Sequence, residues 1–108
     1  MTNNTQFKTL VNTWLNQKKP MITPSTHAGF TLIAENHLIP YFGKRKIGSI
    51  TETDIQNYIS YLYEAGRLDN TGGLTVKTIR DVILVLRLSM EYAYKERIIP
   101  LLRSEEHT

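Results

Sequence analysis

The sequence predicts an all-α protein with one domain and four helices. Three observations lead to this class. Four segments place apolar residues at helical spacing, these segments have residues typical of helix boundaries, and 108 residues are the length of one domain. With 41% hydrophobic residues, the chain can bury a core and needs no covalent or metal cross-link to fold.

The first two helices are predicted over residues 5–18 and from Thr23 to about residue 37. In the first, five apolar residues follow the spacing of one buried face: Phe7, Leu10, Val11, Trp14 and Leu15. Pro20 ends this helix. The second helix begins with Thr23 as its N-cap and Pro24 at its first position. Its apolar residues are Phe30, Ile33 and Ala34.

The segment HLIPYFGKRKIGSIT, residues 37–51, is predicted to connect the second and third helices. Pro40 is expected to prevent the second helix from continuing, because proline has no backbone N–H. The aromatic pair Tyr41 and Phe42 is expected to anchor a turn, and the basic run KRK then crosses the surface. A link of this length suits two helix pairs that cross at a steep angle better than an up-and-down bundle with short loops.

The third helix is predicted to begin at Thr51, in a capping box with Asp54, and to end at Gly66. Its inward-facing residues are Ile55, Tyr58, Ile59 and Leu62. The fourth helix is predicted over residues 75–97 and carries two apolar stripes. They are Val76, Ile79, Ile83, Leu86, Met90 and Ala93 on one side, and Val85, Leu88 and Tyr92 on the other. A helix that is apolar on two sides packs on two sides, so this helix is expected at the centre of the bundle or against a part missing from this chain.

The composition argues against several kinds of site. The chain has no cysteine, which excludes disulfides and thiolate metal sites and suits a reducing cytosol. It has no segment typical of a signal peptide and no apolar run of about 18 residues, so neither secretion nor a membrane span is expected. Its three histidines form no spaced pair, and no glycine-rich nucleotide fingerprint is present. We therefore expect no metal and no cofactor.

Tyrosines recur in the second half of the chain, but they do not indicate catalysis. They are Tyr58, Tyr61, Tyr63, Tyr92 and Tyr94. A tyrosine nucleophile needs cations that activate it and stabilise the attacked group, and no positioned set of His and Arg accompanies these residues. At helical spacing, such rings are typical of core and rim packing. No catalytic residue is expected within the chain.

The net charge of +3 is unevenly distributed. Residues 1–50 contain six Lys or Arg and one acid, whereas residues 51–108 contain seven Lys or Arg and nine acids. This asymmetry indicates a one-sided electrostatic surface and an anionic partner. Chance clustering on solvated faces explains the charge pattern equally well.

Two predicted helix starts combine hydroxyl groups with basic residues. The fourth helix begins with Thr75, Lys77, Thr78 and Arg80. The second follows Lys18 and Lys19 and begins with Thr23, Ser25, Thr26 and His27. A helix start offers free N–H groups to a phosphate. Basic side chains there are unfavourable to the helix dipole, which destabilises the helix slightly. Contacts to a nucleic-acid backbone are slightly favoured over ordinary capping with solvated lysines.

The order of these segments resembles the N-terminal core-binding domain of phage-integrase-type tyrosine recombinases. The likeness covers residues 5–100, and IPYFGKRKIGSIT and LTVKTIRDVILVLRLSMEYAYKERII carry it most specifically. It implies a four-helix, SAM-like orthogonal bundle that, together with a catalytic domain, closes a clamp around duplex DNA. By position, it implies DNA contacts at Ser25, Thr26, Thr75, Lys77, Thr78 and Arg80, with Lys44, Arg45 and Lys46 as contacts to the DNA backbone.

The resemblance also implies a domain plan and partners. Residues 1–100 would form the core-type DNA-binding domain, and residues 101–108 a tail toward a missing catalytic domain, so strand cleavage by this chain is not expected. The implied partners are double-stranded DNA, the catalytic domain of the intact chain and other recombinase protomers on DNA, in the cytoplasm of a bacterium or phage-infected host. A SAM-like protein–protein interaction module is the alternative, because a fold does not fix a function. A helix-turn-helix regulator is disfavoured by the long connections on both sides of the third helix.

Overall fold

The computed structural model describes residues 1–68 and 75–96 and shows the predicted all-α class. Its helical elements are α1 (Phe7–Lys18), α2 (Pro24–Ile33), the π-helical turn η1 (Ala34–Leu38), α3 (Ile39–Phe42), the 3₁₀ turn η2 (Ile47–Ser49), α4 (Glu52–Leu68) and α5 (Val76–Lys95). Within the described ranges there is no sheet, and a single antiparallel bridge joins Gln6 to Lys46. Because α2, η1 and α3 follow one another without a break, they form one long helical unit.

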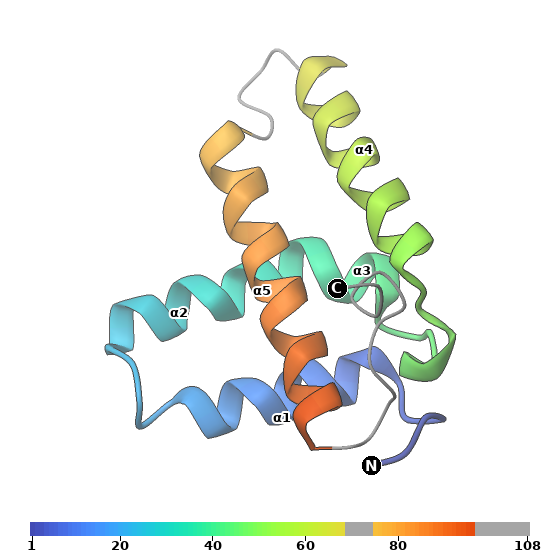
Figure 1. Ribbon diagram of the computed structural model, residues 1–108. Coiled ribbons are helices and arrows are strands. Elements are labelled where there is room, and N and C mark those ends of the chain that lie inside the picture. Colours follow the sequence, from blue (N-terminus) through green and yellow to red (C-terminus); the bar gives the residue numbers. More distant parts are fainter. Residues whose placement is uncertain (69–74, 97–108) are drawn as a thin grey trace, which may run out of the picture.

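The helices form two pairs that cross steeply, as the length of the link predicts. Figure 1 shows α1 and α2 lying along each other, with α5 running across them and α4 beside α5. α5 contacts α1, α2, η1 and α4. The predicted central position of the last helix is therefore confirmed.

The predicted helix starts are also present. The side chain of Thr23 caps α2, with Pro24 in its first turn, and the side chain of Thr75 caps α5. At the start of α4, the Thr51 N–H donates to the Asp54 carboxylate at 2.9 Å, and the Asp54 N–H donates to the Thr51 hydroxyl at 3.1 Å. This reciprocal pair is the predicted capping box.

The prediction that Pro40 ends the second helix is wrong. The helix continues through η1 into α3, and Pro40 lies in the first turn of α3. In a regular α-helix, proline would clash with the carbonyl four residues earlier. Here the N–H of Ile39 bonds to the carbonyl of Ala34, five residues back, so the backbone widens just before the proline. One wide turn gives the ring room while the chain stays helical.

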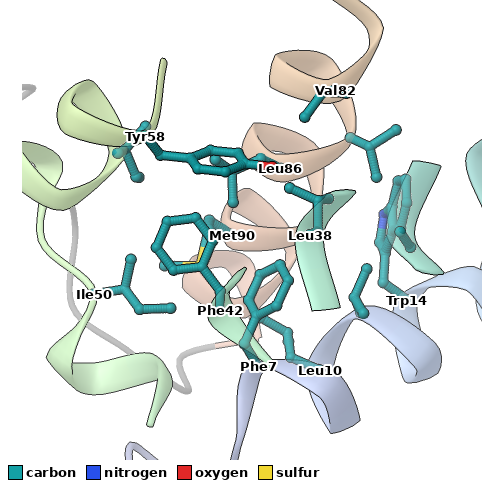
Figure 2. Packing of buried hydrophobic residues seen from close by; sticks show 14 of the residues in the cluster. Phe7, Leu10, Trp14, Leu38, Phe42, Ile50, Tyr58, Val82, Leu86 and Met90 are labelled. Carbon is teal, nitrogen blue, oxygen red and sulfur yellow. The ribbon is translucent and has the colours of Figure 1, made fainter. Parts of the chain in front are cut away.

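The hydrophobic core lies where the two helix pairs cross. All five residues of the predicted α1 face are buried, and Figure 2 shows their neighbours from η1, α3, α4 and α5. The ring of Phe42 lies between those of Phe7 and Tyr58, with centroid distances of 5.9 and 5.0 Å. Phe42 is fully buried, so the predicted anchoring role of this aromatic residue is confirmed.

The link after α3 is tied to the start of α1 by backbone hydrogen bonds. The Phe7 N–H donates to the Arg45 carbonyl at 2.9 Å, and the Lys8 N–H donates to the Gly43 carbonyl at 3.1 Å. The Ile47 N–H donates to the Thr5 carbonyl at 2.9 Å, and Ile47 itself is buried. The link therefore belongs to the packed body of the domain and does more than cross its surface.

Two details of the last two helices differ from prediction. α4 does not end at Gly66 but continues to Leu68, since glycine within a helix costs only about 1 kcal/mol relative to alanine. Val76, placed on the buried stripe of the last helix, is 55% exposed because it begins α5, beyond the packed part of the helix. The predicted helix end at residue 97 lies outside the described residues. None of the described helices is long and apolar enough to cross a membrane.

Candidate nucleic-acid interface

A pair of threonines closes the start of α2. The hydroxyl oxygen of Thr23 accepts the N–H of Thr26 at 3.3 Å, and the Thr23 hydroxyl donates to Thr26 Oγ1 at 2.9 Å. Ser25, between them, is exposed, and its hydroxyl has no partner among the described residues. The first turn of an α-helix also leaves backbone N–H groups without partners inside the helix. Because Pro24 has no N–H and the N–H groups of Thr26 and His27 bond to Thr23, this start offers an anion the N–H and hydroxyl of Ser25 and the hydroxyl of Thr26.

α5 starts in the same way. The hydroxyl oxygen of Thr75 accepts the N–H of Thr78 at 3.1 Å, and the Thr75 hydroxyl donates to Thr78 Oγ1 at 3.1 Å. The segments TPST and TVKT share the spacing Thr-x-x-Thr, which explains why the two caps have the same hydrogen-bond pattern. Both helices thus present the same capping hydroxyls, but α5 also offers the N–H of Val76 where α2 has Pro24, which lacks one.

The two helix starts lie in the same half of the domain as it is drawn in Figure 1. In Figure 1, α2 and α5 both begin in the left half of the view, whereas α3 and the start of α4 lie in the right half. Nε2 of His27 lies 2.9 Å from the carbonyl oxygen of Leu15, which ties the start of α2 to the end of α1. Lys19, just after α1, is exposed.

The two basic residues in the first turns of α5 differ in their surroundings. Nζ of Lys77 lies 3.1 Å from a carboxylate oxygen of Asp81, four residues later, and the Lys77 side chain is 86% exposed. Arg80 is exposed and has no ion-pair partner among the described residues. Both side chains are accessible, and an exposed ion pair such as Lys77–Asp81 contributes only about 0–1 kcal/mol. Either basic side chain can therefore reach a phosphate at little cost in free energy.

Of the other cations of α5, Arg87 is held within the fold and Lys95 forms an exposed ion pair. Arg87 Nη2 donates to Oε1 of Glu52 on α4 at 3.0 Å, and Lys95 lies 3.5 Å from Glu91. The second carboxylate oxygen of Glu52 is buried without a hydrogen-bond partner among the described residues. The Arg87–Glu52 pair thus joins the middle of α5 to the start of α4.

The predicted basic turn lies apart from the helix starts. Figure 1 places residues 44–46 between α3 and α4, in the half of the view opposite the beginnings of α2 and α5. Lys44 and Lys46 are exposed. Arg45 Nη2 donates to the carbonyl of Ser49 at 2.8 Å and to Asp54 at 3.1 Å, so this guanidinium stabilises the link. In this view the basic turn lies apart from both helix starts, and the start of α5 lies well above that of α2.

Comparison with known protein families supplies the context for this geometry. Residues 6–63 match the phage integrase, N-terminal SAM-like domain, and this range holds more than half of the chain, from α1 into α4. The chain belongs to this family. The predicted resemblance and the SAM-like four-helix fold are thereby confirmed, while α5 lies outside the matched range. Comparisons with curated proteins and with solved structures give no match.

This integrase SAM-like domain also contains an aromatic cluster that sequence analysis missed. The rings of Tyr41, Tyr58 and Tyr61 lie with centroids 4.4 to 6.1 Å apart. Tyr58 is buried and donates its hydroxyl hydrogen to the carbonyl of His37, and burial raises the pKa of Tyr58 well above its usual value. Tyr41 and Tyr61 are about half exposed. The sequence shows the spacing of Tyr58 and Tyr61 on α4, but only the crossing of α3 brings Tyr41 beside them.

The aromatic cluster borders a cavity of about 250 Å³. Its lining comprises Asn36, His37, Pro40, Tyr41, Tyr58, Tyr61 and Leu62. No Lys, Arg, Asp or Glu lines this cavity, so it lacks the cations that a phosphate site needs. Among the described residues, no three His, Asp or Glu side chains gather as metal ligands. The charged and hydroxyl groups of the two helix starts therefore form the better candidate for nucleic-acid contact in this integrase domain.

Proposed function

We propose that the chain is the DNA-binding core domain of a site-specific tyrosine recombinase, which holds one face of duplex DNA at a crossover site during DNA integration and recombination. The observation that carries the proposal is the pair of capped helix starts, at Thr23 and Thr75, with exposed donors on both. Membership in the integrase SAM-like family supports DNA as the partner. The net charge of +3 agrees with an anionic ligand.

The helix starts bind phosphates through hydroxyl, backbone N–H and cationic groups. The proposed contacts are Ser25, Thr26, Thr75, Lys77, Thr78 and Arg80. Lys44 and Lys46 form a second contact point at the opposite end of the domain. Arg45 contributes less, because its guanidinium is already bonded to Asp54. Contacts of this kind fix the position of a protein on the duplex without specifying its sequence.

The salt dependence of binding tests this proposal. As one half of a clamp, the chain should bind random duplex DNA with a Kd of roughly 10⁻⁴ to 10⁻⁶ M at physiological salt. Lys77→Ala should reduce the slope of log K against log salt by about 0.9, the value for one phosphate contact. Lys95→Ala is the matched control, because it also removes one exposed lysine from an i, i+4 ion pair on the same helix.

Two outcomes would count against the proposal. Equal losses of slope in Lys77→Ala and Lys95→Ala would show that net charge, rather than a located surface, drives the binding. Binding of the parent that is absent, or unaffected by salt, would favour a SAM-like protein-interaction module. The half-exposed rings of Tyr41 and Tyr61 are the specific observation in favour of that second candidate, because exposed tyrosines are enriched at protein interfaces.

Strand cleavage lies outside the proposed role of this chain. In the recombinase, the catalytic domain of the intact protein supplies the nucleophile, and further protomers bind the same DNA. We expect the 108-residue chain to leave supercoiled DNA neither nicked nor relaxed. A covalent protein–DNA adduct on a denaturing gel would contradict this expectation and direct attention to the exposed Tyr61 and Tyr63.

A further inference from the structure

The aromatic cluster between α3 and α4 presents two accessible rings on a buried third. Tyr58 is buried and donates its hydroxyl hydrogen to the carbonyl of His37, which joins α4 to η1. Tyr41 and Tyr61 pack on Tyr58 at centroid distances of 4.4 and 6.1 Å, and they are 46% and 54% exposed. Because the core holds Tyr58, the two outer rings are positioned before any ligand binds.

The polar groups around the aromatic cluster are not used by the fold. The side-chain amide of Asn36 and the hydroxyl groups of Tyr41 and Tyr61 have no hydrogen-bond partner among the described residues. All three residues are exposed, and all three line the cavity of about 250 Å³ beside the cluster. No Lys, Arg, Asp or Glu lines this cavity. The site therefore combines accessible aromatic rings with free hydrogen-bond donors and acceptors and suits a ligand group that is flat, polar at its edge and uncharged.

A positive charge lies one turn of the chain from the aromatic cluster. The Gly43 N–H donates to the Ile39 carbonyl at 2.8 Å, so the helical turn continues past the end of α3. Lys44 follows Tyr41 by three residues, a spacing that makes side chains neighbours on a helix surface. Lys44 is exposed and forms no ion pair with another described residue. An uncharged aromatic cavity with a free cation beside it is the result.

We propose that the aromatic cluster binds single-stranded DNA, with an unpaired base stacked on Tyr61 and a neighbouring phosphate at Lys44. The inference goes beyond the proposed function, which concerns duplex DNA at the two helix starts, and it keeps Lys44 as a phosphate contact. Aromatic rings beside positive charges are the arrangement by which proteins bind single strands, because every base has a flat face that stacks. The centroids of Tyr41 and Tyr61 are 5.7 Å apart, less than the about 7 Å that a base between two rings needs, so the base stacks on one exposed ring face.

An unpaired base fits this site better than a base pair or an apolar side chain of a protein partner. In duplex DNA each base is stacked on its neighbours, so it offers no free face to Tyr61. An apolar side chain would bury the amide of Asn36 and the tyrosine hydroxyls without hydrogen bonds, which is costly. The edge of an unpaired base carries donors and acceptors for these groups, and the strand also brings a phosphate to Lys44.

Binding of short labelled oligonucleotides at low ionic strength, followed by fluorescence anisotropy, tests the inference. The probes are a thymidine decamer and an abasic decamer, which has the same phosphates but no bases. The parent should bind the thymidine decamer about 5- to 150-fold more tightly, the range expected for one base stacked on an aromatic ring. Tyr61→Leu should lose most of this difference and keep the parent's Tm, because the side chain is 54% exposed. Tyr63→Leu is the matched control and should behave like the parent, because Tyr63 is 46% exposed on the same helix but does not line the cavity.

The outcomes separate this inference from the proposed function. Equal affinity of the parent for the two decamers would show that only phosphates are bound, and equal effects of Tyr61→Leu and Tyr63→Leu would show that the cluster is not the site; either result would overturn the inference. Salt-dependent binding of duplex DNA without any binding of the decamers would also overturn it, leave the proposed function standing and assign the exposed rings to a protein partner. Base-dependent binding of the decamer without duplex binding would support the inference and overturn the proposed function.

Discussion

Replacing Phe42 with alanine should destabilise the domain strongly. The ring is fully buried and packs against Phe7, Tyr41 and Tyr58, with centroid distances of 5.9, 4.8 and 5.0 Å. Removing a buried phenylalanine ring and leaving a cavity costs about 3–5 kcal/mol. The entropy of unfolding is about 2 cal/mol/K per residue. In a domain of this length, a loss of about 4 kcal/mol in the free energy of unfolding therefore lowers the Tm by about 18 °C.

Thermal melting followed by circular dichroism measures this effect. Tyr61→Ala is the matched control, because Tyr61 belongs to the same aromatic cluster but is 54% exposed, and its loss should cost less than about 1 kcal/mol. Phe42→Leu, which largely refills the site, should melt between the parent and the alanine variant and remains informative if Phe42→Ala does not fold. A Tm of Phe42→Ala within two or three degrees of the parent would refute the assignment of the link to the core.

Two further predictions concern backbone positions and pH. Gly29→Ala should stabilise the domain by about 0.5–1 kcal/mol, because Gly29 lies within α2 and an added Cβ meets nothing within 4 Å. Gly43→Ala should instead lower the Tm. Its Cβ would collide with the carbonyl oxygen of Ile39 and lie 2.9 Å from Ile39 Cγ2. Equal melting temperatures for the two variants would contradict the packing around α3. The pKa of Asp54 lies below its usual value because the carboxylate accepts the Thr51 N–H, so its contribution to stability is present above about pH 4 and is lost as the pH falls further. Asp54→Asn should therefore melt below the parent at pH 7, and this difference should shrink in urea or thermal unfolding at acid pH; an unchanged difference would contradict the capping role.

The parts of the fold that depend on near neighbours in sequence could be predicted. The buried face of α1 follows from helical spacing alone, and the Thr51–Asp54 capping box needs only residues one turn apart. The threonine caps of α2 and α5 are equally local. The candidate DNA-contact residues at the two helix starts come from the same local signals, so sequence alone could locate them along the chain.

Features that depend on how the helices cross could not be predicted in this way. Proline alone predicts that a helix stops. Here the helix continues through the π turn before Pro40, because residues of this turn pack on α5. Arg45 belongs to a basic run in the sequence, but the fold brings Asp54 and Ser49 to its guanidinium. Likewise, the freedom of Arg80 is visible only once the partners of the other cations of α5 are known.

The two faces of α5 connect the stability of the domain to its proposed recognition of DNA. The inner face buries Ile79, Leu86 and Met90 among the other helices, and this packing fixes the direction in which α5 leaves the core. The same packing holds α5 against α2, so it also sets the relative positions of the two capped helix starts. Lys77 and Arg80 lie on the exposed part of α5, where substitution leaves no cavity. Changes on the inner face should therefore alter stability and DNA binding together. Replacing the exposed Lys77 or Arg80 should alter DNA binding alone, because rigid elements position contact groups without depending on them for folding.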